Sequence, residues 1–179
     1  MTLATIIMGL FLLGKGITIL TFRSEAAYEK GLCVLRNKVF DGVLTAIAAA
    51  WFLWVVLHLG QADFGDYKNF MFVVFLTTAV GSWYLARDFL GVRAACVIFM
   101  LAAWHFLGAA FAHYEAPARL FMVSAVYVGL VFALYLAAAP YRARDLMEWF
   151  TRHPKAAVIT GSCLAAYGAW LLVIPVCFY

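Results

Sequence analysis

Long apolar runs alternate with short polar segments along this chain of 179 residues. A helix that spans a bilayer needs roughly 20 predominantly apolar residues, with about 17 as the lower end. The runs that meet this requirement cover residues 2–22, 39–60, 70–86, 92–113, 120–139 and 156–178, and the third is the shortest. They are continuous and rich in Ala, Leu and Gly, whereas a β-barrel shows alternating segments of about 10 residues. The pattern predicts an all-α integral membrane protein, with one six-helix transmembrane domain over residues 1–179.

Composition supports this fold class. The chain is 67% hydrophobic and 12% charged, with a mean hydropathy of +0.95. Water-soluble domains carry about a quarter charged residues. A soluble fold, a secreted disulfide scaffold, a disordered chain and a DNA-binding domain are therefore excluded, and nucleic acid is not an expected partner.

The basic residues predict an orientation. Of the 13 Lys and Arg, ten lie in the first, third and fifth loops, Lys68 and Arg119 lie in the even loops, and Lys15 lies inside the first run. Cytoplasmic loops carry an excess of Lys and Arg. We therefore expect an integral protein of a plasma or inner membrane, with basic loops in the cytoplasm and both termini outside. Anionic lipid headgroups are the expected partner of these loops.

The fifth loop has a helical pattern of its own. Leu146, Trp149, Phe150 and His153 are spaced at i, i+3, i+4 and i+7, while most charged residues fall on other faces. This pattern predicts a short helix in the plane of the headgroups, ending before Pro154. The alternative is a partly ordered basic loop. The first and last hairpins also align at a shift of 116 residues, which suggests either a parallel internal repeat or coincidence in a chain rich in Ala and aromatic residues.

Small residues recur at every fourth position on three of the predicted helices, and in lipid such stripes allow helix backbones to pack closely. They predict helix contacts either within the bundle or with another subunit. The residues are Gly42, Ala46 and Ala50 in the second span, Ala125, Gly129, Ala133 and Ala137 in the fifth, and Gly161, Ala165 and Ala169 in the sixth.

Three histidines are the candidate cofactor ligands. Counting about 1.5 Å per helical residue, His58 and His113 reach the outer interface, and His105 lies inside the apolar core beside small residues. An imidazole beside small residues suits a haem or another tetrapyrrole. The simpler interpretation is that these histidines hydrogen-bond neighbouring groups and that no cofactor or metal is bound.

Lys15 is an intramembrane cation, and Asp41 lies at a depth where it could pair with it. An ionisable residue inside a span is a functional candidate, but two charges make a poor proton pathway. We therefore expect a structural ion pair, or a lysine that reaches the headgroups.

No catalytic motif is present, so the sequence favours a non-enzymatic protein. Its compact form and surplus aromatic residues favour an accessory or structural subunit of a larger membrane complex, with other membrane subunits as partners. The alternative is a small-molecule or ion transporter or channel that acts as an oligomer. A further alternative is an electron-transfer subunit that binds haem, another tetrapyrrole or quinone.

Overall fold

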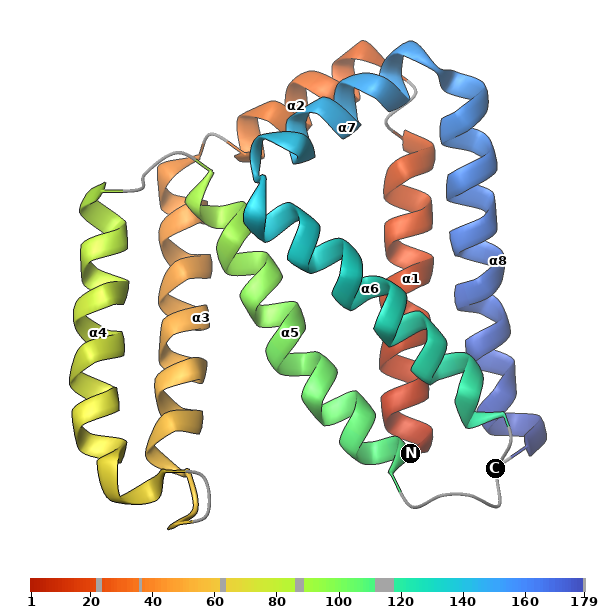
Figure 1. The fold of residues 1–179 in the computed structure, drawn as a ribbon. Coiled ribbons are helices and arrows are strands. Elements are labelled where there is room, and N and C mark those ends of the chain that lie inside the picture. The colour runs from red at the N-terminus through yellow and green to blue at the C-terminus, as the bar shows by residue number, and fades with distance from the viewer. Residues whose placement is uncertain (22–23, 36, 62–63, 86–88, 112–117, 179) are drawn as a thin grey trace.

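The computed structural model describes residues 1–21, 24–35, 37–61, 64–85, 89–111 and 118–178, and these residues form helices without a strand. Six of the helices are long, and Figure 1 shows them running between the same two ends of the molecule. They are α1 (Thr2–Thr21), α3 (Lys38–Leu57), α4 (Lys68–Leu85), α5 (Leu90–Ala110), α6 (Arg119–Ala138) and α8 (Pro154–Phe178). Two shorter helices, α2 (Glu25–Leu35) and α7 (Tyr141–Arg152), lie across their ends, and a 3₁₀ turn, η2 (Gly65–Tyr67), precedes α4. The predicted all-α class is confirmed.

Five of these helices, α1, α3, α5, α6 and α8, are long and apolar enough to cross a membrane. The sixth, α4, corresponds to the shortest predicted run and has 18 residues. It is less apolar because Lys68 and Asn69 occupy its first turn, and Gly81 and Ser82 interrupt its second half. Among the described residues, the structure therefore supports a multi-pass membrane protein with five candidate spans, one fewer than the sequence pattern predicts.

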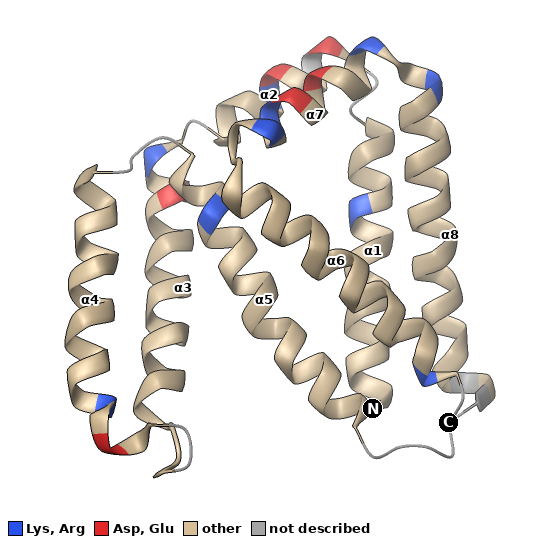
Figure 2. Ribbon diagram, viewed as in Figure 1, with Lys and Arg blue, Asp and Glu red and all other residues tan. Residues whose placement is uncertain are grey.

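The two ends of the molecule differ in charge. Both termini lie at one end, which we call the terminal end, and α2 and α7 lie at the other (Figure 1). Figure 2 shows most of the charged residues on α2, on α7 and on the adjoining ends of α3, α5 and α8. We call this second end the basic end, because its described Lys and Arg are Lys30, Lys38, Arg93, Arg142, Arg144, Arg152 and Lys155.

Helix α7 occupies the fifth loop, where the sequence predicts a helix. It ends at Arg152, and α8 begins at Pro154. Proline suits the first position of a helix because its missing N–H would have no intrahelical acceptor there. Helix α2 fills the first loop and packs beside α7, and the two run in opposite directions (Figure 1).

The first three and last three helices follow one another in the same order and at nearly the same spacing along the chain. The starts of α1 and α6 are 117 residues apart, and those of α2 and α7, and of α3 and α8, are 116 apart. Each unit is a long helix, a short transverse helix and a second long helix. The 116-residue shift seen in the sequence therefore matches the spacing of these helices along the chain, with α4 and α5 between the two three-helix units.

The closest helix contact joins the two ends of the chain, since α1 packs antiparallel along α8. Gly9 faces Gly168, and Gly16 faces Gly161 and Ala165. A Cβ atom on Gly16 would lie 2.6 Å from the Ala165 nitrogen and 2.7 Å from the Gly161 oxygen. Both glycine pairs are seven residues apart on their own helix. A seven-residue interval keeps such positions on one face when two helices cross at about 20°.

Gly16→Ala should destabilise the protein by about 1–3 kcal/mol, because the new methyl group meets backbone atoms that cannot move independently. Gly14→Ala, two residues away on α1, is the matched control. No atom lies within 4 Å of a Cβ at Gly14, so its effect should stay within about 1 kcal/mol. The measurement is thermal unfolding in one detergent. Equal melting temperatures for the two variants would contradict the α1–α8 packing.

Candidate functional site

The small-residue stripe on α6 faces α5. Ala125 and Ala133 are buried, Ala137 is partly buried, and Gly129 lies under the ring of Phe99. A Cβ atom on Gly129 would overlap that ring. This stripe therefore forms a contact inside the chain.

On α3 and on α8, part of the small-residue stripe packs against a neighbouring helix and the rest is exposed. Gly42 is buried against Trp83 of α4, whose ring lies 2.7 Å from the position of a Cβ, whereas Ala46 and Ala50 are exposed. On α8, Gly161 and Ala165 face α1, whereas Ala169 is exposed. The glycine of α8 that continues the contact is Gly168, at a seven-residue rather than a four-residue interval. The sequence signal for this contact is a pair of glycines seven residues apart in the first run, Gly9 and Gly16, and another in the last run, Gly161 and Gly168.

The histidines contact tryptophans of α3. The imidazole of His105 on α5 lies 5.7 Å from the Trp51 ring, centre to centre, and its side chain is exposed. His58, at the end of α3, lies 4.5 Å from the Trp54 ring, and its Nδ1 is 2.8 Å from the Trp54 carbonyl oxygen. His113 lies outside the described residues. Within the described ranges, no three His, Cys, Asp or Glu side chains come together as a metal site.

Asp41 lies against the start of α5. Its carboxylate accepts a hydrogen bond from the backbone of Gly91, the second residue of that helix. A side chain on Gly91 would overlap the carboxylate. Helix N-termini carry free N–H groups and partial positive charge, so a carboxylate is stabilising there. Asp41 therefore joins α3 to α5, as a cap supplied by a neighbouring helix.

Lys15 has different neighbours. Its Nζ lies 5.5 Å from the centre of the Phe11 ring, one turn earlier on α1. The described ion pairs join Arg144 to Asp145 and Arg152 to Glu148. The structure thus does not bring Lys15 and Asp41 together, since Asp41 is engaged by the α5 backbone.

The Tyr167 hydroxyl of α8 donates to the Phe121 carbonyl of α6, whereas seven Ser and Thr hydroxyls of the long helices bond back to their own chain. Each donates to a carbonyl three or four residues earlier: Thr5 to Met1, Thr18 to Gly14, Thr45 to Asp41, Thr77 to Val73, Thr78 to Val74, Ser82 to Ala79 and Ser124 to Leu120. Among described, non-exposed residues, every buried side-chain nitrogen or oxygen atom has a partner. These seven hydroxyls therefore satisfy their own hydrogen bonds within the helices.

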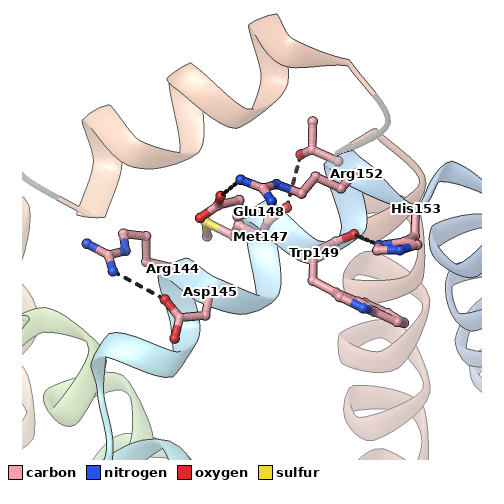
Figure 3. A network of polar contacts seen from close by, with 8 residues as sticks. Arg144, Asp145, Met147, Glu148, Trp149, Arg152 and His153 are labelled. Atoms are coloured by element: carbon pink, nitrogen blue, oxygen red, sulfur yellow. Dashed lines mark hydrogen bonds and ion pairs between the residues drawn. The ribbon is translucent and has the colours of Figure 1, made fainter.

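The polar contacts at the basic end lie along α7. Figure 3 shows the pairs Arg144–Asp145 and Arg152–Glu148, and His153 Nδ1 is 3.1 Å from the Trp149 carbonyl oxygen. Tyr141, at the start of α7, raises the pKa of the Arg142 guanidinium through a side-chain hydrogen bond. The Trp149 indole projects from the side of α7 that faces away from α2 (Figure 3). Helix α7 thus carries two ion pairs together with an aromatic ring that points away from α2.

No family model, curated protein or solved structure matches this chain.

Asp41→Ala should destabilise the protein by about 1–2 kcal/mol, because the first N–H groups of α5 lose an acceptor. Asp41→Asn should destabilise the protein less, since the amide oxygen of Asn can still accept the hydrogen bond from the Gly91 backbone. If Asp41 acts on Gly91 rather than on Lys15, the effects of Asp41→Ala and Lys15→Met should add within about 0.5 kcal/mol. A double-mutant cycle of unfolding free energies in detergent measures this. A larger coupling energy between the two substitutions would instead indicate that Asp41 and Lys15 form an ion pair.

Proposed function

We propose that this protein is a non-catalytic structural subunit of a larger membrane assembly. The observation that carries the proposal is helix α4. It packs on α3 and η2, and none of its residues is buried. Phe75 meets Phe52 of α3, with ring centres 4.9 Å apart, whereas Val73, Val80 and Tyr84 are exposed. A helix held on one side has a whole face available to another chain.

Two further features support a structural role. The chain exposes 11276 Å², against about 8,700 Å² for a compact monomer of its mass, so its helix bundle is more open than a compact monomer. Seven Ser and Thr hydroxyls of its long helices bond back to their own backbone, which leaves these groups less free to line a polar path. Contacts between its helices rest on glycine, alanine and aromatic residues, which are packing groups.

The proposal includes α4 as a sixth span. Its 18 residues extend over about 27 Å, close to the thickness of a bilayer core. Six spans place both termini on one side, as in Figure 1. The basic end then lies in the cytoplasm and the terminal end outside, in a plasma or inner membrane.

Cysteines introduced at Asp66 and at Arg144 test this orientation in intact cells. The exposed Cys33, Cys163 and Cys177 are first replaced by Ser or Ala. An impermeant thiol reagent should label position 66 and should label position 144 only after the membrane is opened. Labelling of position 144 from outside would reverse the orientation.

Val80→Trp tests the exposed face of α4. A large apolar side chain is tolerated where lipid surrounds a helix, but it separates two helices that pack closely. Extraction in mild detergent should yield a particle much heavier than 19.9 kDa containing other chains, and Val80→Trp should release this chain. Val128→Trp, at an exposed position of α6, is the control and should leave the particle intact.

A second function is favoured by the matching order and spacing of the two three-helix units. Parallel internal repeats occur in transporters, where substrate sites lie between the repeats. A transporter would purify alone or as a homo-oligomer, and Val80→Trp would leave its composition unchanged. Recovery of this chain alone from its native membrane would therefore reject the subunit and favour the transporter.

A further inference from the structure

The described core of the bundle is concentrated toward the terminal end. One cluster of buried residues joins α1, α5, α6 and α8, and all of its members lie in the halves of these helices nearest the termini: Met8, Ala103, Ala110, Ala118, Met122, Ala125, Val126, Leu171 and Ile174. Toward the basic end, α1 packs on α8 through Gly16, and a second cluster joins α5 to α6 through Val92, Cys96 and Ala133. The two helix pairs thus share a core at one end only.

One face of α1 passes from the shared core at the terminal end to the more open packing at the basic end. Met8, Phe11 and Lys15 are spaced at i, i+3 and i+7, so they lie on the same face. Phe11 meets Phe99 of α5, with ring centres 5.6 Å apart. Met8 is 1% exposed, Phe11 is 41% exposed, and Lys15 is exposed. We call these three residues the Lys15 face. It opens progressively toward the basic end.

An ammonium group in this position needs a counter-charge. Lys15 lies six residues before the end of α1, or about 9 Å along the axis, and a cation within a span is costly unless it reaches headgroups or a partner. The described carboxylates near the basic end have other surroundings. Asp41 accepts from Gly91, Asp145 and Glu148 pair with arginines, and Glu25 and Glu29 are exposed on α2.

Helix α7 supplies a second group suited to a lipid. Trp149 is 46% exposed although it lies on the side of α7 that faces away from α2 (Figure 3). Tryptophan favours the boundary between headgroups and acyl chains, because its ring is apolar and its N–H donates a hydrogen bond. An exposed indole and an exposed ammonium thus lie toward the same end of the spans, with an aromatic ring, Phe11, below the ammonium.

We propose that the Lys15 face binds one anionic phospholipid from the leaflet at the basic end. Its phosphate lies at the Lys15 ammonium, its acyl chains cover Phe11 and the adjoining surface of α5, and Trp149 contacts the boundary between headgroup and chains. Charge selects an anionic lipid over a zwitterionic one, because a net negative headgroup compensates the cation. This site differs from general attraction to the basic loops, because it lies within the span and holds a single molecule.

The test is native mass spectrometry of the full chain from mild detergent containing equal amounts of phosphatidylglycerol and phosphatidylcholine. The wild type should retain one phosphatidylglycerol per chain, with about five-fold preference, the size expected for one basic side chain at an anionic headgroup. Lys15→Gln should abolish the preference, and Lys15→Arg should keep it. Trp149→Leu should lower the retention of both lipids.

Lys68→Gln is the matched control, since Lys68 begins α4 at the terminal end, and it should leave the preference unchanged. Equal retention of the two lipids by the wild type, or a preference that survives Lys15→Gln, would overturn the proposal. If millimolar inorganic phosphate removes the bound phosphatidylglycerol, the site is a free-anion site and the lipid assignment is wrong. If Lys15→Gln unfolds, Lys15→Met, which keeps a long unbranched side chain without the charge, takes its place, and a preference that survives Lys15→Met would equally overturn the proposal.

Discussion

Two helix backbones can approach closely in lipid only where side chains do not separate them, and the pairing of α1 with α8 depends on this constraint. Water does not drive apolar helices together inside a bilayer, so van der Waals contact must provide the association. Gly9 and Gly16 on one helix and Gly161 and Gly168 on the other remove four side chains from the interface. The first and last helices are thereby fixed to each other, and the transverse helices that follow α1 and precede α8 are brought side by side.

The sequence predicts the local part of this structure well. The helices begin and end within three residues of the predicted runs, because the boundary of an apolar run in lipid is also the boundary of the helix that satisfies its own backbone. The α7 helix and its end before Pro154 also follow from local pattern. The third run differs in one respect. It forms the helix α4, but α4 is not among the five helices that are apolar enough to be candidate spans. Its polar first turn and its Gly81–Ser82 step place it at the margin of the pattern.

The candidate site could not be predicted in the same way, because its contacts join distant parts of the chain. Asp41 and Lys15 have complementary charges and comparable depths, but depth along a helix axis does not specify the direction of a side chain. Asp41 points to α5, where Gly91 leaves its N–H open, and Lys15 lies over Phe11 on its own helix. The four-residue stripes indicated helices that pack, but not the seven-residue interval that determines which residues of α8 meet α1.

The position of α5 between the two three-helix units explains why the bundle is uneven. Helices α1 and α8 meet directly, so an exact duplication would also bring together their counterparts, α6 and α3. Instead, α5 packs on both α3 and α6. Asp41 of α3 binds the α5 backbone, and the Phe99 ring of α5 packs over Gly129 of α6. The inserted helix therefore widens one side of the molecule, while glycine contacts keep the other side closed. Because α2 and α7 connect both sides at the basic end, the long helices there are held together by transverse helices rather than by a shared core.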